Sequence, residues 1–172
     1  RRELEDLVGY PVTGMSYPFG KYDERVISIL QPLGVSYCRT VENTGTFDLP
    51  SRWLSLHPTA HHKSSQLFEK VDEFVKASYQ RRLALFYLWG HSYEFDQNKG
   101  WELLENLCKS LCGYDDIWYA TNSQIFRYLK AKEQLQFTIR HDRVFNPSSV
   151  TVWISVDGNA REILPGEMLS LE

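Results

Sequence analysis

Apolar and polar positions along the first 135 residues follow two patterns in turn, one typical of strands and one typical of helices. Short, mostly apolar segments are each followed by a segment whose apolar residues recur every three or four positions. Connections of helix length favour right-handed crossovers and a parallel sheet, so the predicted fold class is α/β. We expect strands at about 12–18, 35–41, 83–89 and 117–120, an extended piece ending near Thr59, and helices at about 1–9, 23–33, 65–78, 99–112 and from 122 onward.

Local signals predict where several helices begin and end. Gly9 is typical of a residue just beyond a helix C-terminus, and Asp23 is a suitable N-cap for the helix that follows it. Asn122 and Ser123 together make a capping signal for the last helix.

The apolar period changes to two near residue 136. Residues 137–139 and 150–156 alternate between apolar and polar side chains, and Asp157-Gly158 is a typical two-residue hairpin turn. The sequence therefore predicts two domains, an α/β domain over 1–135 and a small antiparallel β unit over 136–172.

Composition excludes some classes of partner. The 172 residues are 42% hydrophobic, which is enough to bury one sizeable core. The net charge is −3 and the basic residues are scattered, so nucleic acid is not an expected partner. No apolar run approaches the ~20 residues that span a bilayer, and no secretory signal is evident, so we expect no membrane partner and favour a cytoplasmic location. We expect the three cysteines to be buried, reduced thiols.

Unusual side chains follow the ends of the predicted strands, where ligands meet parallel α/β sheets. They combine aromatic rings, histidines and one arginine, a set suited to a polar substrate with apolar faces such as a sugar. The predicted substrate-binding residues are Tyr17, Arg39, His61, His62, Trp89, Tyr93 and Trp118.

His91 is the candidate catalytic residue. It follows an apolar strand and Gly90, which permits close approach of a ligand or another part of the chain, and an imidazole exchanges protons near neutral pH. The alternative is a structural histidine bonded to a neighbouring carbonyl. Arg39 has a similar alternative, a salt bridge at the rim of the sheet, and the aromatic residues have the alternative of packing in the core.

His57, His61 and His62 do not have the spacing of a compact metal site. Adjacent residues on an extended segment point to opposite sides, and Pro58 disfavours the helix that would pair His57 with His61. No carboxylate lies at motif spacing. We therefore predict no metal ligands in this chain and, at best, micromolar binding of zinc. Substrate contact and a structural role both remain open for these histidines.

Several motifs resemble the C-terminal part of the polysaccharide deacetylase-like family, and the resemblance extends from about residue 1 to 122. It implies a partial (β/α) barrel and metal-dependent hydrolysis of an N- or O-acetyl group on an acetylated carbohydrate, with a divalent ion, usually zinc, and a late histidine that acts as the acid. His91 matches that histidine by position. The motifs are GMSYPFG at 14–20, CRTV at 38–41, PTAHH at 58–62, FYLWGHSYEF at 86–95 and IWYATN at 117–122.

The chain also departs from the family pattern. Ser16 stands where the family has an arginine that orients the base, so either Arg39 takes this role from the next strand or this branch of the family works differently. His91 lies one residue beyond the family's usual Leu-x-His spacing. The Asp-Asp and His-x-x-x-His motifs, which supply the family's base and metal ligands, do not occur upstream of Ser16. We therefore expect a C-terminal portion that is inactive alone.

Two further expectations follow. A non-catalytic carbohydrate-binding or interaction domain is the alternative function, since the aromatic residues are present without the metal ligands. Five or so strands do not close a barrel, so we expect exposed strand edges that favour a homo-oligomer or are covered by residues 136–172.

Overall fold

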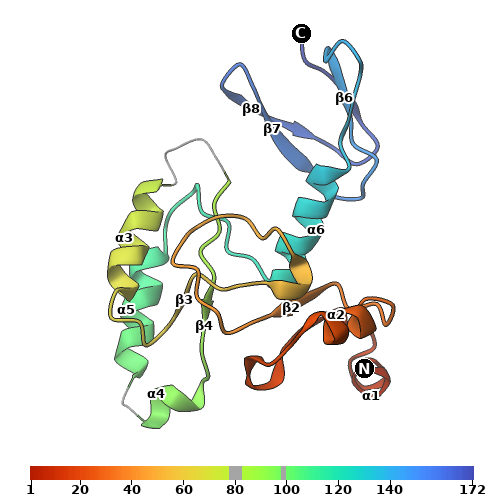
Figure 1. Ribbon diagram of the computed structural model, residues 1–172. Coiled ribbons are helices and arrows are strands. Elements are labelled where there is room, and N and C mark those ends of the chain that lie inside the picture. Colours follow the sequence, from red (N-terminus) through yellow and green to blue (C-terminus); the bar gives the residue numbers. More distant parts are fainter. Residues whose placement is uncertain (78–82, 98–99) are drawn as a thin grey trace. The chain divides into compact units, whose positions relative to one another are not determined.

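The computed structural model describes residues 1–77, 83–97 and 100–172 (Figure 1). The chain divides into two compact units, Arg1–Tyr119 and Ala120–Glu172. Both contain small sheets and helices, so the fold is mixed α/β, and the described residues form no closed barrel. The predicted domain boundary, after residue 135, lies later than this division, which places the last helix in the C-terminal unit.

The helices of the N-terminal unit form where the sequence predicts them. Helix α1 (Arg2–Val8) ends at Gly9, whose left-handed φ of 74° suits glycine. Helix α2 (Glu24–Leu30) begins after Asp23, whose carboxylate accepts a 2.8 Å hydrogen bond from the Val26 N–H. The longer helices are α3 (Leu67–Ala77) and α5 (Trp101–Leu111); residues 78 and 99 of the predicted ranges lie outside the described residues. A short helix, α4 (Tyr93–Gln97), was not predicted.

Strands of the N-terminal unit pair in parallel, as predicted, but they are short. β1 (Gly14–Ser16) pairs with β2 (Tyr37–Arg39), and β3 (Ala60–His61) pairs with β4 (Leu88–Trp89). The strand predicted over 83–89 is therefore limited to its last two residues.

Thr59 accounts for part of this shortening. Its N–H donates to the Tyr87 carbonyl at 2.8 Å, and its hydroxyl accepts from the Tyr87 N–H at 3.0 Å and donates to the Leu85 carbonyl at 3.3 Å. These backbone groups are thus satisfied outside a ladder. The strand predicted at 117–120 is also absent, and the Ile117 N–H instead donates to the Tyr114 carbonyl in a turn.

Two apolar clusters hold the N-terminal unit together. One contains Tyr17, Ile27 and Cys38, the last of which lies in β2. The other lies between α3 and α5, which run side by side in Figure 1. Its buried members are Leu67, Val71 and Leu107.

The C-terminal unit joins one helix to two antiparallel sheets. Helix α6 (Asn122–Glu133) begins with a capping box between Thr121 and Gln124, so the cap lies one residue before the predicted Asn122. The predicted hairpin turn is confirmed: Asp157 and Gly158 have φ of 50° and 81°. The sheets have the orders β5-β6-β9 and β7-β8; their strands are β5 (Gln136–Phe137), β6 (Arg143–Phe145), β7 (Val152–Val156), β8 (Asn159–Ile163) and β9 (Met168–Ser170).

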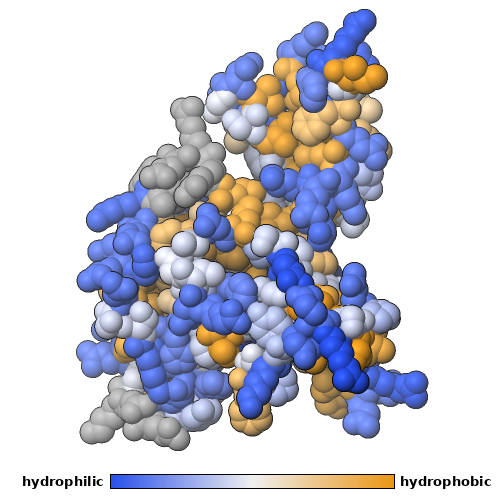
Figure 2. All heavy atoms as spheres, viewed as in Figure 1, coloured by the Kyte–Doolittle hydropathy of each residue, from blue (hydrophilic) through white to orange (hydrophobic). Residues whose placement is uncertain are grey.

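Several apolar side chains of the N-terminal unit are exposed. Figure 2 shows such orange side chains at the surface among blue, polar ones. Leu7, Phe19, Ile29 and Leu33 are all more than half exposed, and among the described residues β1 pairs only with β2. Association through this edge therefore stays a prediction.

None of the helices in the described part of the chain has both the length and the apolar character needed to cross a lipid bilayer.

The cysteines differ in exposure, which corrects part of the expectation. All three are unpaired, but only Cys38 is buried, while Cys108 and Cys112 on and after α5 are exposed. Burial raises the pKa of Cys38 to about 11, so almost none of it is thiolate at neutral pH.

Under native conditions Ellman's reagent should therefore modify Cys108 and Cys112 and leave Cys38 unmodified until denaturant is added. Peptide mapping of native, labelled protein checks this, and early labelling of Cys38 would contradict it.

Candidate functional site

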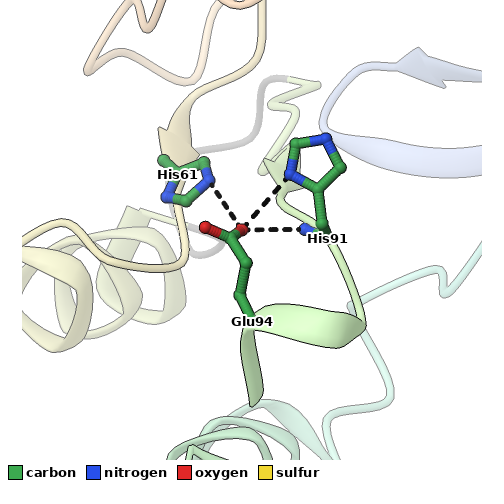
Figure 3. Close-up of side chains that lie close together, drawn as sticks. All are labelled: His61, His91 and Glu94. Atoms are coloured by element: carbon green, nitrogen blue, oxygen red, sulfur yellow. Dashed lines mark hydrogen bonds and ion pairs between the residues drawn. The ribbon is translucent and has the colours of Figure 1, made fainter. Parts of the chain in front are cut away.

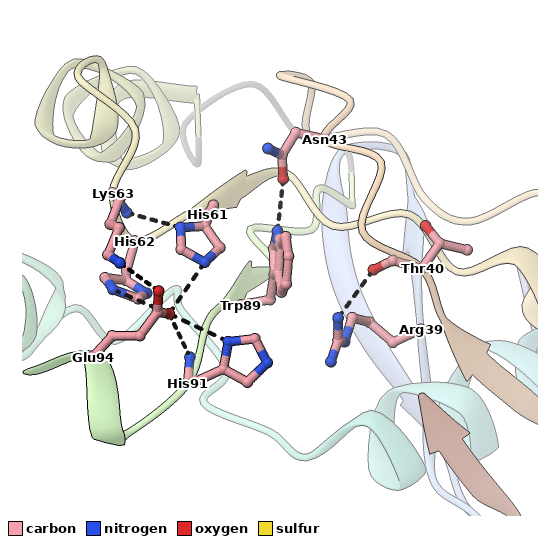
Figure 4. Close-up of polar contacts among 9 residues, drawn as sticks. All are labelled: Arg39, Thr40, Asn43, His61, His62, Lys63, Trp89, His91 and Glu94. Atoms are coloured by element: carbon pink, nitrogen blue, oxygen red, sulfur yellow. Dashed lines mark hydrogen bonds and ion pairs between the residues drawn. The ribbon is translucent and has the colours of Figure 1, made fainter. Parts of the chain in front are cut away.

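The pairing of β3 with β4 brings the central histidines together. Register places His61 opposite Trp89, and the His62 N–H donates to the Trp89 carbonyl at 3.0 Å. Beyond Trp89 the chain passes through Gly90 to His91. The ends of these two parallel strands thus carry three histidines and an indole on neighbouring segments, as Figure 4 shows.

Glu94, in the first turn of α4, lies at the centre of this group. Its Oε2 accepts a 3.2 Å hydrogen bond from the His91 N–H and lies 3.3 Å from His91 Nδ1. The same oxygen is 3.5 Å from His61 Nε2 and 3.7 Å from His62 Nε2. Lys63 Nζ binds the other oxygen, Oε1. The Glu94 side chain is only 12% exposed, so one carboxylate faces three imidazole rings and an ammonium group.

This environment sets the charges. The Lys63 ammonium, helped by the His91 N–H, lowers the pKa of Glu94 to about 2 despite the opposing effect of burial. Burial lowers the pKa of His61, and the neighbouring His62 lowers it further. At neutral pH the site therefore combines a carboxylate anion with a neutral His61 ring.

His61 and His62 do not point to opposite sides, which corrects the expectation drawn from strand alternation. β3 ends at His61, and the chain then turns, with the Ser64 N–H donating to the His61 carbonyl at 2.9 Å. Because His62 lies in this turn, its ring lies beside that of His61, with centroids 4.3 Å apart and the planes tilted by 32°, and both Nε2 atoms face Glu94. His62 is 4% exposed, and its Nδ1 is buried without a hydrogen-bond partner.

Trp89 forms the wall beside the histidines. Its Nε1 donates to Asn43 Oδ1 at 2.7 Å, and the Arg39 guanidinium lies 4.7 Å from its ring centroid (Figure 4). Its ring meets His61 edge-on at 4.4 Å. Arg39 and Trp89 therefore belong to one cluster with His61, and Asn43 fixes the indole.

Tyr93 extends this surface at the start of α4. Its ring is 55% exposed and lies 5.3 Å from the His91 ring. His91 is itself half exposed, which leaves this corner of the site open to solvent.

The other two predicted substrate-binding residues, Tyr17 and Trp118, differ in exposure. Tyr17 is only 3% exposed, and its hydroxyl donates to the Leu54 carbonyl at 2.8 Å, so it packs in the core. Trp118 is 57% exposed in the segment where the predicted strand does not form. The third histidine of the sequence cluster, His57, contacts other residues: its Nδ1 lies 2.7 Å from Thr40 Oγ1 and 3.9 Å from Glu42 Oε2.

Sequence reasoning missed Glu94, Lys63 and Asn43. Glu94 lies three residues after His91, a spacing that brings side chains together in a helical turn. That signal was available in the sequence, but the five-residue helix α4 was not predicted.

Comparison of the chain with protein-family models, curated proteins and solved structures finds no match.

Proposed function

We propose that this chain is the C-terminal portion of a metal-dependent polysaccharide deacetylase-like hydrolase, which removes N- or O-acetyl groups from a carbohydrate. The observation that carries the proposal is the His91–Glu94 pair: a half-exposed imidazole held by a carboxylate, with Trp89 and Tyr93 beside it. The resemblance of the motifs around these residues supports the same reaction.

The pair suits a proton donor to the leaving group. The Glu94 carboxylate holds His91 Nδ1, and the second ring nitrogen lies on the side away from Glu94 (Figure 3). A carboxylate that orients an imidazole in this way fixes the tautomer and leaves the outer nitrogen for the substrate. Trp89 and Tyr93 offer rings to the apolar faces of a sugar, and Arg39 adds a donor beside them.

The remaining chemistry lies elsewhere under this proposal. The base and the metal ligands of the resembled family are supplied by its Asp-Asp and His-x-x-x-His motifs, which precede the segment that Ser16 matches, and neither motif occurs upstream of Ser16 in this chain. The divalent ion would supply an activated water. We therefore expect no deacetylation by the 172-residue chain alone.

The test is acetate release from acetylated chito-oligosaccharides and acetylated xylan by the product of the native gene with its upstream sequence. His91→Ala should lower kcat by about 10²–10⁴-fold, the usual contribution of a positioned acid. His141→Asn is the matched control, since His141 is exposed with φ of 55°, a conformation that asparagine tolerates. No acetate release from either substrate, or equal loss in both variants, would contradict the proposal.

A non-catalytic carbohydrate-binding domain is the second candidate. It is favoured by the anchoring of Trp89 by Asn43 and Arg39, which presents a preorganised ring without any metal. Titrating the 172-residue chain with chito-oligosaccharides should then change its tryptophan fluorescence, and Trp89→Ala should remove the change. Binding without acetate release by the full gene product would favour this candidate, and no response would exclude it.

A further inference from the structure

Three imidazole nitrogens surround one carboxylate oxygen at an unusual spacing. His91 Nδ1, His61 Nε2 and His62 Nε2 lie 3.3, 3.5 and 3.7 Å from Glu94 Oε2. Hydrogen bonds from N–H to oxygen usually measure about 2.7–3.2 Å, so the His91 contact is a long hydrogen bond and the other two are longer still. A tetrahedral zinc ion with bonds of about 2.0–2.2 Å holds its ligand atoms about 3.4 Å apart. The first two distances match that spacing.

We propose that His61 Nε2, His91 Nδ1 and Glu94 Oε2 bind one divalent transition-metal ion, preferably zinc. One ligand atom from each of the three residues lies within 4.8 Å of the other two. Figure 3 shows the Glu94 carboxylate between the two rings. Since His91 is half exposed, its ring is able to turn toward His61 and shorten the distance between the two ligand nitrogens. Two imidazoles and a carboxylate are a common ligand set for zinc, and they leave a fourth position for water or a ligand oxygen.

The surroundings support these three ligands rather than a larger set. His62 is buried behind them, with its ring 4.6 Å from Phe95 and 4.3 Å from His61, so it packs against the site. Trp89 covers the other side of His61. Apolar walls of this kind exclude water from the ligands and strengthen their attraction for a cation.

Lys63 limits the affinity in two ways. Its backbone N–H donates to His61 Nδ1 at 3.1 Å, and this bond must be given up because a neutral ring that binds the ion through Nε2 carries its proton on Nδ1. Its ammonium binds Glu94 Oε1, which leaves Oε2 for the ion but places a positive charge next to it. The Lys63 side chain is 50% exposed and can move into solvent when the ion binds. We therefore expect micromolar rather than tighter binding, and we expect removal of the ammonium to strengthen it.

This ligand set differs from the Asp-Asp and His-x-x-x-His motifs of the resembled family, and the inference does not depend on the proposed function. The ion would occupy His91 Nδ1 and Glu94 Oε2, the atoms whose hydrogen bond orients the imidazole in the proposed acid, so the two roles belong to the metal-bound and the metal-free states of the same residues. Metal binding and acetate release are measured separately, so the failure of one leaves the other standing.

The test is titration of the chelator-treated 172-residue chain with zinc by calorimetry and with cobalt by visible absorption. We expect one equivalent of zinc with a micromolar Kd, and the intense visible bands of four-coordinate cobalt. His61→Ala, His91→Ala and Glu94→Gln should each weaken binding at least about tenfold. His141→Asn should leave it unchanged. Circular dichroism and thermal unfolding identify any variant that fails to fold.

Lys63→Met gives a result that misfolding does not imitate. Removing the competing ammonium should strengthen zinc binding by up to about fivefold, the range expected for a partly exposed ion pair. Tighter binding by Lys63→Met with weaker binding by Glu94→Gln would support the site. No zinc binding by the wild-type chain, or binding that Glu94→Gln and His91→Ala leave intact, would overturn it.

Discussion

Gly90→Ala should destabilise the N-terminal unit by about 2 kcal/mol, as expected for overpacking at a buried contact. A Cβ at this position would lie 1.9 Å from His62 Nδ1 and 2.6 Å from His62 Cε1. The His62 ring is 4% exposed and held between His61 and Phe95, so it has little room to move. The sequence predicted that Gly90 allows a ligand or another part of the chain to come close. The structure places the His62 ring there. Gly90 is not among the residues of positive φ, so the cost is steric.

A double-mutant cycle separates this contact from a general effect on the fold. Urea unfolding would be followed for Gly90→Ala, His62→Ala and the double variant. Because His62→Ala removes the ring that the new methyl group meets, Gly90→Ala should cost much less in that background. An equal loss of unfolding free energy in both backgrounds would show that the contact with His62 does not determine the effect.

Two helix ends and the hairpin turn could be predicted from the sequence because their signals are local. Gly9, Asp23 and the Asp157-Gly158 turn each act within a few residues, and each has the conformation expected of it. Strand length could not be predicted in this way. The hydroxyl of Thr59 replaces ladder partners for residues 85–87, and that contact joins segments far apart in the sequence.

The candidate site was predicted only in part for the same reason. Position after a strand indicated His61 and His91, and the parallel register of β3 and β4 brings their segments together. The convergence of His61 and His62 depends on the turn at the end of β3, which overrides strand alternation. Glu94 depends on the short helix α4, whose five residues carry too little periodicity to be recognised.

Asn146→Ala should destabilise the C-terminal unit by about 3 kcal/mol, the cost of leaving buried polar groups without partners. Asn146 is fully buried, and its Nδ2 donates to the Val150 carbonyl at 2.8 Å and to the Ile163 carbonyl at 3.0 Å. Its Oδ1 accepts from the N–H and the hydroxyl of Ser148 at 3.0 and 2.7 Å. One amide thus joins the end of β8 to the loop that leads into β7.

Asn146→Asp tests whether the donors are responsible, because it keeps the acceptor for Ser148 while a carboxylate faces the two carbonyls. We expect it to be at least as destabilising as Asn146→Ala. At a site without solvent, a negative carboxylate oxygen would face the two carbonyl oxygens in place of the N–H donors. Asn159→Ala, at an exposed position of β8, is the matched control and should change the unfolding free energy little. Hydrogen exchange of the amides in 143–172 reports on this unit directly. We expect faster exchange in both Asn146 variants but not in Asn159→Ala, because Asn146 holds the strands and the loop together through buried hydrogen bonds. Unchanged exchange in Asn146→Ala would mean that the apolar contacts of Val144, Val152 and Ile163 are enough to hold this unit together.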